Sequence, residues 1–327
     1  MQNPNFPKGL NIKPSTLSAG LELSGASSVV EDANQFGASA QQHAIGKYGI
    51  AGRVWEAAYA LNLYIDPPAD WSFDPPFVLN PNAPQTLIEL GSGTGIVGKR
   101  ISNRLVPHRD LIIVTDLAEV CFPAFEMTPI MLKPSKVCPL LEQNLYMQQN
   151  HTVVVRPLAW GSFADAESVL SDVLLRRTPP FLTRIICSDL VYFPELLAPL
   201  LRSLIQLSSP PFSPPFSDSD PGVSIIISYK VRSLAKETPF WSAFGLWFSF
   251  EPVVFKGKGQ HCWTRFGSLD DSPFIFVAHR RPASFSWDIP QSDQDLLQGV
   301  GACGTASQKS DDTFETILLM SMEDDFS

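Results

Sequence analysis

Four glycines lie close together in the segment TLIELGSGTGIVGKR, which covers residues 86–100. Gly91, Gly93, Gly95 and Gly98 directly follow an apolar run typical of a short β-strand and lead into a pattern typical of a helix. Glycine lacks a side chain, so the backbone at these positions can turn sharply and approach a bound molecule closely. The N-terminus of the following helix also offers free backbone N–H groups. This loop is therefore the strongest candidate for a ligand-binding site.

Two interpretations of the loop concern ligands that carry phosphate. The spacing Gly93-x-Gly95-x-x-Gly98 fits the dinucleotide-binding fingerprint, and Asp116 lies 18 residues beyond Gly98, where an acid would bind a ribose. The same glycines nearly fit a nucleotide-binding P-loop, but Arg100 occupies the position at which that loop needs Ser or Thr for magnesium. The dinucleotide interpretation therefore stays open, and the P-loop is excluded.

A third interpretation starts two residues earlier. The spacing Glu89-x-Gly91-x-Gly93-x-Gly95 is that of the glycine-rich motif of S-adenosylmethionine-dependent methyltransferases. In such a site an acid ends the first strand, and the glycines make room for the methionine part of the cofactor. An acid that ends the second strand, here Asp116, binds the ribose hydroxyls.

The elements around this loop alternate between strand and helix patterns. Five near-continuous apolar strands joined by helices predict a parallel sheet that is covered on both faces. Such a sheet binds ligands at the carboxyl ends of its strands. We expect an α/β fold with a Rossmann-like, seven-stranded, mostly parallel sheet that closes in a C-terminal antiparallel hairpin. The expected strands are 86–90, 111–115, 152–156, 184–188, 223–229, 248–255 and 274–279; the expected helices are 52–65, 94–105, 140–149, 164–175, 194–207 and 234–246.

The chain divides into three parts by composition. Residues 1–44 are polar and lack periodicity, which predicts a flexible N-terminal arm. Residues 45–281 form the expected catalytic domain, with Pro-rich insertions at about 122–139 and 208–222. Residues 282–327 are expected to be an acidic, mostly disordered tail. Most of the formal net charge of -9 lies there, because residues 287–327 hold nine acids and one Lys.

Composition also narrows the class of protein. The nearly neutral remainder of the chain argues against a nucleic-acid or membrane-surface protein. The five cysteines are scattered, which predicts a reduced compartment, the cytoplasm or also the nucleus. The five histidines show no metal-ligand spacing, so we assign no metal. Without a coiled-coil or repeat pattern, a monomer is expected.

Five further segments accompany the glycine loop. In chain order the motifs are GRVWEAAYAL, LIELGSGTGIVG, VTDL, LAWG, SDLVY and SYKVR, spread over residues 52–232. With the apolar strands that follow, to residue 279, the chain resembles the seven-stranded protein-lysine methyltransferases that modify translation elongation factors and chaperones. The resemblance implies transfer of a methyl group from S-adenosylmethionine to a lysine. Candidate targets by resemblance are elongation factor 1A, heat-shock chaperones and AAA-type ATPases.

The resemblance also implies roles for particular residues. At the substrate lysine, Asp189 and Tyr192 form a D-x-x-Y motif, with Asp189 capturing and orienting the amine and acting as general base only as an alternative. Lys230 and Arg232 match a Y-K-x-R motif and are given no role beyond support of the fold. The implied cofactor-binding residues are Trp55, Glu89, Gly91, Ser92, Gly93, Asp116, Leu117, Trp160 and Ser188.

Other functions remain open from the residues. Within the same fold, a histidine or small-molecule methyltransferase is an alternative, although the D-x-x-Y motif favours lysine. An NAD(P)-dependent oxidoreductase would use the dinucleotide fingerprint, but no helix carries a Y-x-x-x-K motif. A non-catalytic, methyltransferase-like scaffold that binds through its acidic tail is the third class.

Overall fold

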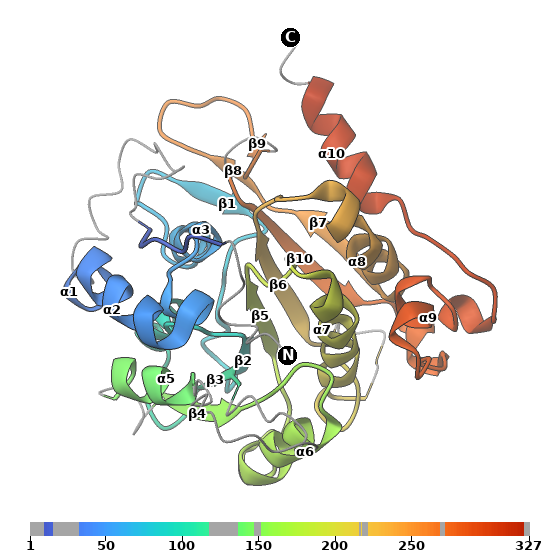
Figure 1. The fold of residues 1–327 in the computed structure, drawn as a ribbon, viewed down its shortest axis with the longest axis horizontal. Helices are drawn as coiled ribbons and strands as arrows, with labels where there is room; N and C mark the ends of the chain where they lie inside the picture. Colours follow the sequence, from blue (N-terminus) through green and yellow to red (C-terminus); the bar gives the residue numbers. More distant parts are fainter. Residues whose placement is uncertain are drawn as a thin grey trace, which may run out of the picture.

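The computed structural model describes residues 10–15, 33–117, 137–146, 152–215, 217, 222–268 and 272–323. Within these ranges, seven strands form one sheet (Figure 1). β10 runs antiparallel to both of its neighbours, and the other six strands run parallel to one another. The expected fold class is therefore confirmed. The strand order is β4 (Val153–Pro157), β3 (Leu111–Asp116), β2 (Thr86–Leu90), β5 (Arg184–Ser188), β6 (Ser224–Tyr229), β10 (Phe274–Arg280) and β7 (Phe248–Pro252).

Helices cover both faces of the sheet, because successive apolar residues of a strand point to opposite sides. Ile112 and Ile186 pack in the cluster that includes the residues of α3 (Glu56–Ile65), α4 (Ile96–Ser102) and α5 (Cys138–Asn144). Ile113 and Ile185 pack on the other face, against α6 (Phe163–Asp172), α7 (Pro194–Leu207) and α8 (Leu234–Trp247). In Figure 1, α3 lies on one side of the sheet and α7 and α8 lie on the other.

The expected strand 248–255 is interrupted, and its second half belongs to another sheet. β7 ends at Pro252, and β8 (Val254–Lys256) pairs with β1 (Ser72–Asp74) and β9 (Thr264–Arg265). Proline cannot donate a hydrogen bond to a neighbouring strand, which favours a break at this point. The small sheet packs its aromatic side chains, Phe73 and Phe255, against Phe266.

The expectation of a flexible arm at residues 1–44 is wrong for its described part. Residues 33–48 form α1 (Ala33–Phe36) and α2 (Ala38–Tyr48). The buried amide of Gln41 accepts from the backbone N–H groups of Ser15 and Val54 and donates to the carbonyl of Ser15. These contacts join positions far apart in the sequence, so local periodicity gave no sign of them. Residues 1–9 and 16–32 lie outside the described residues.

The expectation of a mostly disordered tail from residue 282 is also wrong. The tail contains α9 (Asp293–Leu297) and α10 (Thr313–Glu323), which lie beside α7 and α8 (Figure 1). Phe314 is 1% exposed, and its ring stacks on Trp241 at 4.7 Å between centroids. The acidic composition concealed this packing, because a few buried apolar residues suffice to attach the segment while Asp288, Asp293 and Asp312 remain exposed.

The two Pro-rich insertions are only partly visible. Most of 122–139 lies outside the described residues, which resume at Val137 before α5. In 208–222, Phe212 is buried in the core, and its carbonyl accepts a hydrogen bond from the backbone of Leu182, so this part is not a surface loop. Among the described residues, no helix has the length and apolar character to cross a membrane.

Candidate active site

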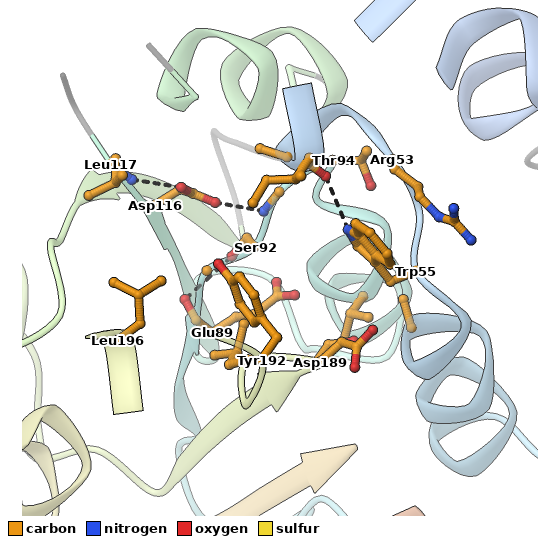
Figure 2. A pocket seen from close by; sticks show the side chains of 18 of the residues that line it. Arg53, Trp55, Glu89, Ser92, Thr94, Asp116, Leu117, Asp189, Tyr192 and Leu196 are labelled. Atoms are coloured by element: carbon orange, nitrogen blue, oxygen red, sulfur yellow. Dashed lines mark hydrogen bonds between the residues drawn. The ribbon is translucent and has the colours of Figure 1, made fainter. Parts of the chain in front are cut away.

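One cavity of about 420 Å³ lies at the carboxyl ends of β2, β3 and β5, where the chain continues to opposite sides of the sheet. Figure 2 shows side chains that point into it from several elements. The structure brings together around this cavity all the residues that the sequence selected. They are Trp55, Glu89, Gly91, Ser92, Gly93, Asp116, Leu117, Trp160, Ser188, Asp189 and Tyr192.

The glycine loop forms one wall of the cavity. Gly91 and Gly93 have φ angles of +56° and +53°, in the left-handed region that favours glycine. A Cβ atom on Gly91 would lie 2.9 Å from the Trp160 ring and 2.8 Å from the Leu190 side chain. The backbone N–H of Ser92 donates to the carbonyl of Thr115 at 2.8 Å. The loop therefore requires glycine for both conformation and space, and β3 holds it in place.

Asp116 ends β3 and closes the same wall. Its Oδ2 accepts a hydrogen bond from the N–H of Gly93 at 2.8 Å, and its Oδ1 accepts from the N–H of Leu117 at 2.7 Å (Figure 2). Burial raises the pKa of Asp116 to about 6, against the effect of these two hydrogen bonds. At neutral pH the side chain is therefore mainly a carboxylate, and each oxygen keeps a further lone pair for a ligand.

Two buried oxygen atoms at the cavity lack a hydrogen-bond partner within the described part of the chain. They are Oε2 of Glu89, at the end of β2, and Oγ of Ser188, at the end of β5. Burial raises the pKa of Glu89 to about 8. An unpaired buried acceptor is costly, so these atoms fit a ligand that supplies hydrogen-bond donors or positive charge.

Aromatic side chains line a further part of the cavity, beside the glycine loop. Trp160 meets Tyr192 edge to face, with 6.4 Å between ring centroids, and Phe193 packs against Tyr192 at 4.6 Å. Burial raises the pKa of Tyr192 above its usual range, so the phenol stays protonated at neutral pH. Trp55 lies across the cavity and donates its indole N–H to the carbonyl of Ile50 at 3.0 Å.

Asp189 follows β5 in an uncommon backbone conformation, with a φ of +64°. Its N–H donates to the carbonyl of Ser228 at 2.8 Å, which holds this turn against β6. Both carboxylate oxygens accept hydrogen bonds from the guanidinium of Arg232, and the pair of Nη1 and Oδ1 is 2.7 Å apart. Asp189 therefore lines the cavity as half of a bidentate ion pair.

Sequence reasoning missed the place of Arg232 in the site. Its guanidinium lines the cavity and lies over the Trp55 ring at 5.3 Å, while Arg53 lies over the same ring at 4.4 Å. The Y-K-x-R motif was a signal for Arg232. No pattern pointed to Leu10, which reaches the cavity from the N-terminal segment.

A sequence model of a family described as lysine methyltransferase matches residues 39–243. The match covers the glycine loop, Asp116, Asp189 and Arg232, as well as α2 from its second residue, although residues 38–44 of this helix were expected to belong to a flexible arm. It therefore includes most of the side chains that surround the cavity.

Several solved structures are similar in chain path. One is the carbon methyltransferase CurJ, with 13% identity, a TM-score of 0.35, and coverage of 62% of this chain and 50% of that chain. A precorrin-6y methyltransferase from Geobacter metallireducens has 14% identity, a TM-score of 0.35, and coverage of 69% and 87%. Fibrillarin from Aeropyrum pernix, solved with bound S-adenosyl-L-methionine, has 14% identity, a TM-score of 0.35, and coverage of 68% and 76%. The chain thus spans half the length of the first.

Proposed function

Because the chain belongs to the lysine methyltransferase family, we propose that it transfers a methyl group from S-adenosylmethionine to the ε-amine of a lysine on another protein. The family match over residues 39–243 carries this proposal. The arrangement of Asp189 and Tyr192 beside the glycine loop supports it. Family membership argues against the oxidoreductase alternative, and the intact Glu89, Gly91, Gly93 and Asp116 around one cavity argue against a non-catalytic scaffold.

The residues at the sheet end of the cavity fit the methyl donor. Gly91 and Gly93 leave space that any Cβ atom would reduce, and Asp116 offers acceptors suited to ribose hydroxyls. The unpaired oxygens of Glu89 and Ser188 suit a ligand that supplies hydrogen-bonding groups, and a cationic group on that ligand would favour the ionised form of Glu89. S-adenosylmethionine, when bound, supplies a methyl group made electrophilic by its sulfonium.

The residues at the other end fit the acceptor amine. A lysine amine has a pKa of about 10.4 in water, so it must lose a proton before its lone pair can attack. The aromatic side chains of Tyr192 and Phe193 exclude water around the amine, which favours its neutral form. Trp160 lies beside Gly91, in keeping with its expected role at the cofactor. Asp189 can accept an N–H of the amine and orient it, and such alignment supplies much of the rate enhancement in a displacement of this kind.

The target is a protein in this proposal, and the resemblance narrows its class. Elongation factor 1A, heat-shock chaperones and AAA-type ATPases are the candidates, and a histidine or small-molecule acceptor is the alternative within the fold. We further propose that the protein acts as a monomer in the cytoplasm or nucleus. The described residues contain no group of three or more His, Cys, Asp or Glu side chains arranged to hold a metal ion.

Calorimetric titration of the full chain with S-adenosylhomocysteine, with NAD and NADP in parallel, tests the cofactor. We expect binding of the first alone, in the micromolar range, and its loss in Gly93→Arg. Incubation with donor carrying a labelled methyl group and a cell lysate, followed by amino-acid analysis of the labelled proteins, tests the acceptor. Methyl-lysine is the expected product. Label on histidine or on small molecules alone would contradict the proposal.

A further inference from the structure

Asp189, the carboxylate expected to face the substrate amine, is paired with Arg232. One of its lone-pair positions remains free to accept a further hydrogen bond. The Asp189 side chain is 1% exposed, and its two oxygens offer about four lone-pair positions. Two of these positions receive N–H groups from the guanidinium of Arg232, and a third faces the backbone N–H of Lys230 at 3.5 Å. A neutral amine can therefore still donate one hydrogen bond to Asp189 without meeting a net negative charge.

The structure holds Arg232 firmly in this position. Glu237, in the first turn of α8, accepts hydrogen bonds from the backbone N–H groups of Arg232 at 3.2 Å and Ser233 at 3.1 Å. It also accepts from the hydroxyl of Tyr229 at 2.5 Å, at the end of β6. Burial lowers the pKa of Arg232, but the adjacent Asp189 raises it above its usual range, so the guanidinium stays charged.

A second feature also disfavours an additional cation. The face of Trp55 could attract an ammonium group, but the guanidinium groups of Arg53 and Arg232 already lie over this ring at 4.4 Å and 5.3 Å. Arg53 in turn pairs with Glu56 at 2.5 Å. An ammonium group that entered here would meet two cations and no unpaired carboxylate.

The other ionisable groups around the pair do not supply that carboxylate. Glu237 is occupied by Tyr229 and by backbone N–H groups, and the phenol of Tyr192 is protonated. Glu195, in the first turn of α7, is exposed to solvent. The elements packed against the pair contribute the following charged or titratable groups: Arg53 before α3, Glu56 in α3, Tyr192 after β5, Glu195 on α7, Lys230 and Arg232 after β6, and Glu237 on α8. Glu89 and Asp116 line the same cavity from β2 and β3. Asp116 accepts hydrogen bonds from the N–H groups of Gly93 and Leu117, and burial raises the pKa of Glu89 to about 8, so this carboxyl is mainly protonated at neutral pH.

We propose, on the basis of the lysine methyltransferase function above, that Arg232 is a positioning residue that cancels the charge of Asp189, so that the site takes up the substrate amine in its neutral form. An unpaired carboxylate would stabilise the ammonium form and raise the pKa of the lysine by about one to three units. With Arg232 in place, Asp189 orients the amine without that effect. The amine lone pair then forms the new nitrogen–carbon bond, and the electrons of the broken carbon–sulfur bond remain on sulfur. The methylated amine leaves as a cation and gives its proton to solvent.

Binding of n-butylamine tests this proposal without any protein substrate. The full chain, loaded with S-adenosylhomocysteine, is titrated by calorimetry at about pH 7.5 and about pH 9.5, between which the neutral fraction of a lysine-like amine rises roughly a hundredfold. The wild-type affinity should rise with pH by tenfold or more, and Arg232→Lys, which keeps the charge, should behave in the same way. In Arg232→Gln the affinity should stay level or fall, because the unpaired Asp189 prefers the ammonium form. Arg100→Gln is the matched control, because it removes a guanidinium that pairs with Asp66 at 3.1 Å outside the cavity, and it should keep the pH dependence of the wild-type chain.

The pH profile of methyl transfer onto lysate proteins gives the second measurement. The midpoint of the rise in rate should move up by about one unit or more in Arg232→Gln and stay in place in Arg232→Lys. A lower rate at every pH with an unmoved midpoint would show a merely structural role and overturn the proposal. An affinity of the wild-type chain for n-butylamine that falls with pH would also overturn it, even if Arg232→Gln did not fold. If the proposed function is wrong, the wild-type chain will form no methyl-lysine at any pH. The n-butylamine titration does not depend on that result and still tests the role of Arg232.

Discussion

The backbone N–H of Gly93 donates a hydrogen bond to Oδ2 of Asp116 at 2.8 Å, so the glycine loop after β2 and the acid at the end of β3 form one unit. The two residues are separated by 23 positions in the sequence. Asp116 therefore both holds the loop and presents acceptors to the ligand. A change at either residue should affect cofactor binding through the other.

Replacement of Asp116 by Asn should lower the affinity for S-adenosylhomocysteine by about tenfold to a hundredfold, because hydrogen bonds to a charged group contribute roughly 1.5–3 kcal/mol. The wild-type affinity should also weaken as the pH falls through about 6, where Asp116 takes up a proton. Calorimetric titration of both chains with S-adenosylhomocysteine at about pH 5 and about pH 8 measures both effects, because Asp116 is more protonated at the lower pH. An affinity of Asp116→Asn equal to that of wild type would remove Asp116 from the binding site.

Gly91→Ala should weaken cofactor binding by tenfold or more and lower stability. The new Cβ atom would lie within 2.9 Å of Trp160, at a φ of +56° that costs a non-glycine residue about 1–2 kcal/mol. Gly46→Ala is the matched control, because Gly46 lies inside α2 with no atom within 4 Å of the added Cβ. That variant should keep full affinity and gain up to about 1 kcal/mol of stability. Calorimetry and urea unfolding measure the two quantities, and equal behaviour of the variants would contradict the steric argument.

The free energy of unfolding of the ligand-free chain should fall as the pH rises from about 6.5 to about 8 and level off above that, because of Glu89. Burial raises the pKa of this carboxyl from 4.5 to about 8 in the folded chain. Its neutral form therefore adds stability that is complete below the unfolded pKa and is lost as the pH rises through the folded one. Glu89→Gln should remove this slope, whereas the exposed Glu167→Gln should keep it. Urea unfolding of the wild-type chain and the two variants at several pH values measures this dependence. The same change of unfolding free energy with pH in all three would contradict the role of Glu89.

Phe314→Ala should destabilise the whole domain by about 3–5 kcal/mol, the usual cost of removing a buried phenylalanine. The reason is its stacking on Trp241 at 4.7 Å inside the core. Phe163, which begins α6 and is 55% exposed, provides the control, and its replacement by Ala should change stability by less than about 0.5 kcal/mol. Thermal unfolding of both variants measures the difference. A tail that contributes nothing would give two equal melting temperatures.

Asp189→Asn should reduce methyl transfer by at least a hundredfold, about 2.7 kcal/mol, with cofactor affinity within about threefold of wild type, or about 0.65 kcal/mol. Asn tolerates the φ of +64° at this position, so the backbone is preserved while the charge is lost. Asp189→Ala should lose the same activity and additional stability, because alanine is strained in this conformation. Transfer of labelled methyl groups to lysate proteins and titration with S-adenosylhomocysteine separate these effects. Full activity in Asp189→Asn would exclude this carboxylate from the reaction.

Much of the central fold could be predicted from the sequence. The strands at 86–90 and 184–188 and the helix at 194–207 have the expected bounds, because buried parallel strands and amphipathic helices leave strong local patterns. The boundary near Pro252 was missed, since the pairing of β8 with β1 depends on a segment about 180 residues away in the chain. The order of the motifs selected eleven residues that line the cavity, but it did not place Arg232 or Leu10 there.

The sequence by itself determined the sheet, the glycine loop and the family, because each depends on residue types at short, fixed spacing. Only the tertiary structure showed three contacts. Arg232 pairs with Asp189, Gln41 links the backbone of Ser15 to that of Val54, and Phe314 stacks on Trp241 in the core. These contacts join residues that are distant in the chain, and their free energy comes from burial and hydrogen bonding between surfaces that meet only after folding. Local periodicity does not indicate such contacts. For this reason the polar N-terminal segment and the acidic C-terminal segment were not predicted to belong to the folded domain.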